Sequence, residues 1–320
     1  MNGWLMSFSF HRYRHIMAGG VLCVLLAACG TGIEVTDHVT DKDVRRVIEQ
    51  VDNRQSTVTL DPYIDSLKAW NPGKRFWVTD DQINKMLAYD NDTLHLAGHI
   101  LLYRSCGVDG ILIGDYNNRR LSLIFEDSET GARYCYYAGK EVEASRPGFT
   151  FPMLIDMDMV EHYARQIVDK DFYIRTPIWY DRDNEQMING RHFIKVHIDS
   201  VLPGNSVMPL RVLFTTVDRG DKAMVWMSTG MAAMYGRDFD ALFVAADPRS
   251  AYPDISDETW KRITCGQVVE GMTKEECLLS LGSPKGINAL PDQSGLREYW
   301  YYDGGSYLFF VDGLLSRFRR

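Results

Sequence analysis

The stretch "EGMTKEECLLSLGSP" at residues 270–284 contains the start and stop signals of a short helix. Thr273 and Glu276 have the spacing of a capping box, in which each side chain accepts a hydrogen bond from the backbone N–H of the other residue. Gly282 is suited to a C-terminal cap, and the proline two positions later cannot continue a helix. The sequence therefore predicts a helix over residues 274–281.

Cys277 in this helix has two interpretations, a nucleophile or a packed side chain. With Thr273 as the N-cap, Met272 and Cys277 occupy the two positions of a hydrophobic staple, so Cys277 points inward. A helix N-terminus can lower the pKa of a thiol, but no histidine follows His197 to act as its base. We therefore predict that Cys277 is a small core thiol or one half of a disulfide.

A second helix and three strands are predicted around this helix. The stretch "AADPRSAYPDIS" at 245–256 marks a boundary, and Ser256 caps a helix whose first turn is acidic and whose Trp260 and Ile263 face inward. Two helices on one face of a three-stranded antiparallel sheet are expected. The three strand stretches are "REYWYYD" at 297–303, "SYLFFVD" at 306–312 and "LLSRFRR" at 314–320.

This C-terminal module resembles the SmpA/OmlA family, whose fold is that of the small lipoprotein of the outer-membrane assembly machine (BamE-like). The resemblance implies a helix-helix-sheet module that binds other envelope proteins and has no catalytic residues. Members of the assembly-factor type consist of this module alone, whereas here a long chain precedes it. The residues that carry the resemblance are Ile263, "GMTKEE" at 271–276, "LGSP" at 281–284, "WYY" at 300–302 and "FFVDGLL" at 309–315.

The first predicted strand of this module is rich in aromatic residues. Strand alternation puts Tyr299 and Tyr301 on one face and Trp300 and Tyr302 on the other. One face must pack on the helices, and the other then stays apolar. We take these four residues as candidates for partner binding.

In the middle of the chain, four successive stretches each resemble a later stretch. Their order is kept while their offsets drift, as differences in loop length produce. Each unit is rich in aromatic and β-branched residues, and a predicted helix precedes each, at 63–70 and at about 158–168. The pairs are "GKRFWVTD" (73–80) with "DKDFYIRT" (169–176), "LAGHILLY" (96–103) with "INGRHFIKV" (188–196), "LSLIFED" (121–127) with "LRVLFTT" (210–216), and "RYCYYAG" (133–139) with "AMVWMSTG" (223–230).

These two β-rich repeats faintly resemble bacterial SH3-like modules, which are small barrels. The resemblance implies binding to peptides, such as those of peptidoglycan; a purely structural spacer is the alternative. An earlier helix at 41–52 carries an apolar stripe that we interpret as core.

The N-terminal residues have the pattern of an export signal. Arg12 and Arg14 precede an apolar run at 16–28 that is too short to span a bilayer. The sequence "LAACG" at 26–30 resembles the lipobox of bacterial lipoproteins, which implies cleavage before Cys29 and lipidation of that residue with fatty acyl chains such as palmitate. An ordinary secretory signal cut at small residues is the alternative.

The mature chain would be acidic. Removal of residues 1–28 takes away two arginines and no acidic residue, so the formal charge changes from −8 to −10. An acidic chain argues against nucleic acid as a partner and against electrostatic binding to anionic lipid. Four cysteines remain besides Cys29, and pairing of neighbours is the simplest disulfide pattern, with four thiols as the alternative. The neighbours are Cys106 with Cys135 and Cys265 with Cys277.

No residue cluster predicts an enzyme or a metal site. The histidines lack metal-ligand spacing, and the acidic stretches "DMD" (156–158) and "YDRDNE" (180–185) lack the calcium-loop pattern, so we expect solvated turns there. The best enzymatic alternative is a cell-wall or polysaccharide-processing accessory enzyme with Cys106 as its nucleophile.

The sequence thus predicts an α+β protein with two tandem β-rich, small-barrel-like repeats, each with a preceding helix, and then a helix-helix-three-stranded-sheet module. The expected function is a non-catalytic, lipid-anchored lipoprotein that binds envelope proteins or cell wall, without cofactor, at the periplasmic side of the outer membrane. The expected domains are 1–28 (signal peptide), 29–70 (lipidated linker with helices), 71–150 (repeat 1), 151–250 (helix and repeat 2) and 251–320 (C-terminal module).

Overall fold

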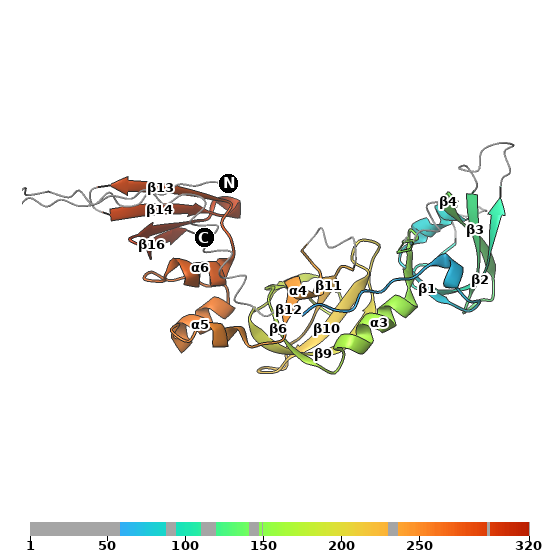
Figure 1. Cartoon of the computed structure of the whole chain (residues 1–320), viewed down its shortest axis with the longest axis horizontal. Coiled ribbons are helices and arrows are strands. Elements are labelled where there is room, and N and C mark those ends of the chain that lie inside the picture. Colours follow the sequence, from blue (N-terminus) through green and yellow to red (C-terminus); the bar gives the residue numbers. More distant parts are fainter. Residues whose placement is uncertain are drawn as a thin grey trace, which may run out of the picture. The chain divides into compact units, whose positions relative to one another are not determined.

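The computed structural model describes residues 58–87, 94–109, 120–140, 147–148, 150–229, 236–292 and 295–319. Three sheets hold the strands of these ranges, and every pairing between neighbouring strands in them is antiparallel. The described helices are short (Figure 1). The predicted α+β class is therefore confirmed. The signal segment, Cys29 and the predicted helix at 41–52 lie outside the described residues.

The first sheet has the strand order β4-β3-β2-β1-β5. Its core contains a chain of edge-to-face aromatic rings, with Phe76 5.5 Å from Phe125 and Phe125 6.0 Å from Tyr136 between ring centroids. All three are fully buried. The strands are β1 (Arg75–Val78), β2 (Ile100–Asp109), β3 (Arg120–Asp127), β4 (Arg133–Lys140) and β5 (Leu154–Asp156), with the 3-10 helices η1 (Leu67–Ala69) and η2 (Asp81–Met86) beside them.

The helix predicted at 63–70 is wrong in extent, because only the turn η1 forms there. Polar side chains of this segment form hydrogen bonds that do not belong to a helix. Asp65 accepts hydrogen bonds from the backbone N–H of Ser66 and from Trp70 Nε1, and Tyr63 donates to Asp156. Local side-chain bonds of this kind compete with helix formation.

The second sheet has the order β12-β6-β9-β10-β11-β7-β8, and helix α3 (Met157–Ile167) packs on it through β9. Val160, Tyr163 and Ile167 of α3 are buried, so the predicted helical spacing is confirmed. The other elements are β6 (Asp171–Ile174), β7 (Ile178–Tyr180), β8 (Met187–Asn189), β9 (Ile194–Pro203), β10 (Leu210–Thr216), β11 (Lys222–Met227), α4 (Phe239–Leu242), β12 (Phe243–Val244) and η5 (Pro248–Ala251).

The stretches that match in sequence pair with their neighbours in the same order in the first and second sheets. Those stretches contribute to β1, β2, β3 and β4 in one sheet and to β6, β9, β10 and β11 in the other, and each set pairs in the same successive order. β1 and β6 also bury alternate residues in the same positions. The second sheet differs by carrying β12 beside β6 and the β7-β8 hairpin beside β11.

The C-terminal module combines α5 (Asp257–Thr264) and α6 (Lys274–Leu281) with a sheet of order β13-β14-β15-β16. The predicted bounds of α6 are confirmed, and both hydrogen bonds of the capping box are present. Gly282 ends the helix at a φ of 77°, a conformation that favours glycine. Ser256 caps α5 by accepting a bond from the N–H of Thr259. The strands are β13 (Gly286–Asp292), β14 (Gly295–Tyr301), β15 (Tyr307–Val311) and β16 (Leu314–Arg319), with η6 (Asp303–Gly305) between β14 and β15.

The expected three-stranded sheet is therefore wrong by one strand, because β13 pairs along β14 from Gly286 to Asp292. Its sequence, "GINALPD", contains glycine, asparagine and proline, which are depleted in strands. Pro291 is tolerated there because β13 is an edge strand, where a missing N–H breaks no inner ladder.

Candidate functional site

The outer side of the C-terminal sheet carries part of the predicted aromatic surface. The alternation along β14 is confirmed, since Trp300 is 1% exposed while Tyr301 is 45% exposed. Tyr302, just after β14, packs against the core and donates from its hydroxyl to the carbonyl of Gly282 at 3.1 Å. Trp300 and Tyr302 are thus structural, and the prediction that they bind a partner is wrong.

Aromatic residues of β15 extend this outer side. The ring of Tyr299 lies 4.6 Å from Phe309, 6.3 Å from Tyr307 and 6.4 Å from Tyr301 between centroids. The guanidinium of Arg317 lies over Phe309 at 5.9 Å. We call these residues the outer aromatic face: Tyr299, Tyr301, Tyr307, Phe309 and Arg317. The sequence predicts its tyrosines on β14 but not its members on β15 and β16, which only strand pairing brings beside them.

Beneath this face, a buried ion pair fixes helix α6 to the sheet. Glu298 is fully buried, pairs with Lys274 at the start of α6, and accepts a hydrogen bond from Trp300 Nε1 at 3.1 Å. A buried carboxylate needs such partners to offset its lost hydration. Neither residue was predicted to have a role.

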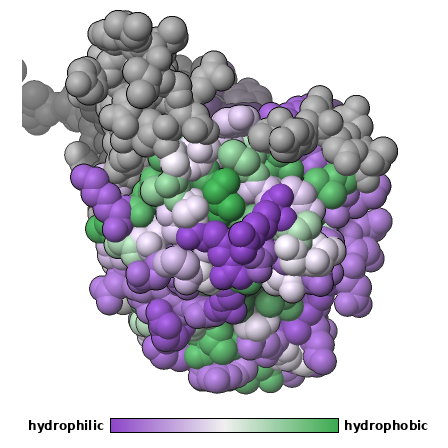
Figure 2. Space-filling view, turned by 90° about the vertical axis from the view of Figure 1, so that its right-hand side faces the viewer, coloured by the Kyte–Doolittle hydropathy of each residue, from purple (hydrophilic) through white to green (hydrophobic). Residues whose placement is uncertain are grey.

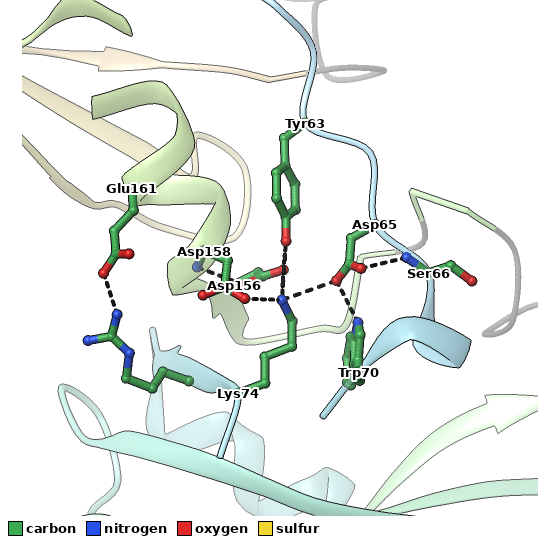
Figure 3. A network of polar contacts seen from close by, with 9 residues as sticks. Tyr63, Asp65, Ser66, Trp70, Lys74, Asp156, Asp158 and Glu161 are labelled. Atoms are coloured by element: carbon green, nitrogen blue, oxygen red, sulfur yellow. Dashed lines mark hydrogen bonds and ion pairs between the residues drawn. The ribbon is translucent and has the colours of Figure 1, made fainter. Parts of the chain in front are cut away.

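A second polar site surrounds Lys74 at the start of β1 (Figure 3). The side chain of Lys74 is 6% exposed, and its Nζ lies 2.7 Å from Asp158, 2.8 Å from Asp156 and 3.1 Å from Asp65. The hydroxyl of Tyr63 lies 3.1 Å from the same nitrogen and donates to Asp156 at 2.7 Å. We call these five residues the Lys74 network.

Separate elements bring this network together. Asp65 and Tyr63 precede η1, whereas Asp156 ends β5 and caps α3, with Asp158 in the first turn of that helix. Because β5 pairs with β1, the acidic N-terminus of α3 is held beside Lys74. The stretch "DMD" is therefore not the solvated turn that the sequence predicts: Asp156 is 15% exposed on its side chain and paired.

Burial and neighbouring charges both shift the pKa values of the network. Burial of the ammonium acts to lower the pKa of Lys74, but Asp156, Asp158 and Tyr63 outweigh it and hold that pKa above its ordinary value. Burial raises the pKa of Asp156 although the Lys74 ammonium opposes the shift. Burial and the carboxylate of Asp156 raise the pKa of Tyr63. Lys74 therefore stays protonated.

Aromatic rings complete the environment of this ammonium. The rings of Trp70 and Phe76 each have their centroids 5.7 Å from Lys74 Nζ. Trp70 Nε1 donates to Asp65 at 2.5 Å, so the ring and the carboxylate are held together. A cavity of about 670 Å³ adjoins these residues and is lined by Trp70, Phe76, Asp65 and Asp156 among others.

The predicted disulfides do not form. Cys106 is an exposed free thiol on β2, and Cys135 lies on β4, with β3 between the two strands. Two strand spacings of ~4.8 Å exceed the reach of a disulfide. Cys265 is exposed and free at the end of α5, and Cys277 is buried and free in the core, as its staple position predicts. Burial raises the pKa of Cys277 to about 12.

The described histidines have separate partners. His95 contacts Asp81 at 2.9 Å, His99 contacts Asp127 at 3.1 Å, and His197 contacts Asp171 at 2.8 Å. Within the described ranges, no three side chains of His, Cys, Asp or Glu gather as a metal-binding group. The loop "YDRDNE" is an Asx turn in which Asp181 accepts hydrogen bonds from the backbone N–H groups of Asp183 and Asn184.

Comparisons with protein families, with curated protein sequences and with solved structures found no match to this chain. None of the helices in the described ranges has the length and apolar character that crossing a membrane requires.

Proposed function

We propose that this chain is a non-catalytic, lipid-anchored lipoprotein of the cell envelope that binds an envelope protein through the outer aromatic face. The observation that carries the proposal is the exposure of Tyr301 above Tyr299 and Phe309 on the side of the sheet that faces away from the helices. Tyrosine, phenylalanine and arginine are enriched in the centres of protein interfaces.

Among the described residues, exposed large hydrophobic side chains also gather on the β7-β8 hairpin, at Ile178, Met187 and Ile188, but none of these is aromatic. On the face shown in Figure 2, apolar areas are small and stand among hydrophilic residues. Among the described strands of the first sheet, Tyr137 on β4 is the most exposed aromatic residue. Its exposed fraction is 38%. It therefore serves as a matched control for Tyr301.

Sequence features support the rest of the proposal. The lipobox-like "LAACG" places a lipid on Cys29, and the expected location is the outer membrane, facing the periplasm. The SmpA/OmlA resemblance fits a module of two helices and an antiparallel sheet. We further propose that the β1–β4 and β6–β11 meanders are tandem copies of one small SH3-like barrel, which would bind cell-wall peptides or act as a spacer.

An accessory enzyme that uses Cys106 is the second candidate. Cys106 is exposed, and burial together with the nearby Cys106 side chain raises the pKa of Tyr103. Among the described residues, no hydrogen bond joins Cys106 to a histidine, so the histidine base that a cysteine nucleophile uses is not in place there.

The test is in-cell cross-linking of the full chain, with partners identified by mass spectrometry. We expect Tyr299→Ser with Tyr301→Ser to remove the main cross-linked protein while the chain stays folded, and Tyr137→Ser to leave it unchanged. Truncation after Tyr252 should remove the same partner. If the double variant retains its partners, the outer aromatic face is not the binding surface.

The anchor is tested separately by Cys29→Ser. We expect loss of labelling by radioactive palmitate and loss of the signal-cleaved form. Labelling that persists in this variant would contradict lipidation at Cys29.

A further inference from the structure

The cavity beside the Lys74 network has the size and walls of a small-molecule site. Its volume of about 670 Å³ falls within the range of ~300–1,000 Å³ that such sites occupy. The rings of Trp70 and Phe151, 5.1 Å apart, form part of its wall. Aliphatic side chains complete an apolar lining for the body of a ligand, and they belong to Leu154, Ile155 and Met159.

The charged groups that line the cavity have one sign. Among the described residues these are Asp65 and Asp156, both carboxylates. Lys74 has no N–H donor left for a ligand. Its Nζ already has four oxygen atoms within 3.1 Å, and an ammonium has three N–H donors. Asp158 adds a third carboxylate to the same ammonium, so the polar wall keeps an excess of negative charge.

Both lining carboxylates retain acceptor capacity. Asp65 accepts bonds from Ser66 N, Trp70 Nε1 and Lys74, and Asp156 accepts from Asp158 N, Tyr63 and Lys74. A carboxylate has about four lone-pair positions, so each can accept one more donor. The neighbouring faces of Trp70 and Phe76 also attract positive charge, as their position around Lys74 shows.

We infer that this cavity binds a small amphipathic amine, with its apolar body among Trp70, Phe151 and Met159 and its protonated amino group at Asp65 and Asp156. Among the described residues of the lining, an anionic ligand of the same shape would meet two carboxylates and no available cation. A neutral ligand would gain the apolar contacts alone. The inference goes beyond the partner-binding proposal and does not depend on it, because the residues are different.

The test compares two water-soluble probes of matched shape, 4-fluorophenethylamine and 3-(4-fluorophenyl)propanoate. The full chain is held in lipid nanodiscs, and ligand binding is followed by broadening of the fluorine-19 signal, with empty nanodiscs as the blank. We expect the amine to bind with a Kd at least about tenfold lower than the propanoate, since a single favourable charge contact near a protein surface has that effect.

Three variants locate the binding. Val207 lines the cavity and is 53% exposed, so Val207→Trp fills the space without changing a core position and should abolish amine binding. Val217, 55% exposed and outside the cavity lining, provides the control, and Val217→Trp should bind the amine normally. Asp158→Asn, at a half-exposed position, should weaken amine binding about three- to tenfold and leave the propanoate no weaker.

Three results would overturn the inference. These are a fluorine-19 signal of the amine that broadens no more than in the blank, a propanoate that binds as tightly as the amine, and a Val207→Trp variant that binds the amine as the wild type does. Any one of these failures shows that the cavity does not select a cationic amphipathic ligand.

Discussion

The outer aromatic face and the Lys74 network both join aromatic rings to charged groups, yet they differ in shape and in origin. The face is built from neighbouring strands that are close in sequence, between Tyr299 and Arg317, and it is presented on the outside of a sheet. The network unites Tyr63 and Lys74 with Asp156, about 90 positions later, beside a cavity. A flat face suits a macromolecule, whereas a cavity suits a small ligand.

The two sites also differ in what holds them. Lys74 is buried and has three carboxylates, so the network is part of the packing between β1, β5 and α3. Tyr301 stands on a sheet whose stability comes from the other side, through Trp300 and Phe310. Substitution of the buried Lys74 should therefore damage folding, whereas substitution of the exposed Tyr301 should affect binding alone.

The largest effect is expected from Lys74→Met. Removal of the ammonium leaves buried carboxylates without their partner, which costs about 3–5 kcal/mol in free energy of unfolding. Urea denaturation followed by tryptophan fluorescence measures the loss. Lys85→Met, at an exposed lysine of η2, should change stability by less than about 0.5 kcal/mol. Equal effects of the two variants would show that the network is not structural.

An effect of comparable size is expected within β14 itself. Trp300→Ala should destabilise the C-terminal module by about 3–5 kcal/mol, because it removes a fully buried ring. Tyr301→Ala, one residue along, should cost no more than about 1 kcal/mol. The midpoint of denaturation by guanidinium chloride measures both. A large loss in Tyr301→Ala would mean that the outer aromatic face is part of the core.

A pH-dependent effect is expected at Asp127 in the first sheet, which is buried but lies outside the Lys74 network. Burial acts to raise its pKa, but bonds from Thr130 and the N–H of Glu129, with His99 nearby, hold that pKa below the ordinary value of 3.8. Because the folded-state pKa is the lower one, the stabilisation is present above about pH 4 and is lost as pH falls through the folded-state pKa.

Asp127→Asn should therefore cost about 1–3 kcal/mol at pH 7 and progressively less below about pH 4, where the unfolded wild-type chain binds the proton more readily than the folded one. Thermal unfolding at pH 7 and pH 3 gives the two differences. A constant difference across this range would contradict the shifted pKa.

The smallest effect is expected from reductant. If Cys106, Cys265 and Cys277 are thiols, dithiothreitol should leave the free energy of unfolding unchanged, whereas a native bridge would contribute about 2–4 kcal/mol. Labelling with Ellman's reagent at pH 8 checks the same point. Cys106 and Cys265 should react in the native protein, and Cys277, whose pKa burial raises to about 12, should react only after unfolding. Loss of stability on reduction would restore the disulfide interpretation.

Much of the local structure could be predicted. The bounds of α6, the caps of α5 and α6, the buried stripe of α3 and the two faces of β14 all follow from signals within a few residues. Such signals act through the nearest backbone bonds and through side-chain periodicity, which the sequence displays directly. Strand β13 was missed for the same reason: its local residues argue against a strand, and pairing with β14 overrides them.

By itself, the sequence determined the α+β class, the bounds of α6, the N-cap of α5, the inward position of Cys277 and the placement of Trp300 and Tyr301 on opposite faces of β14. Only the tertiary structure decided that Glu298 pairs with Lys274, that Phe309 joins Tyr299, and that four oxygen atoms from distant segments surround Lys74. The physical reason is that caps and alternation depend on neighbours in the chain, whereas the partner of a buried charge is chosen by strand pairing and packing between remote residues.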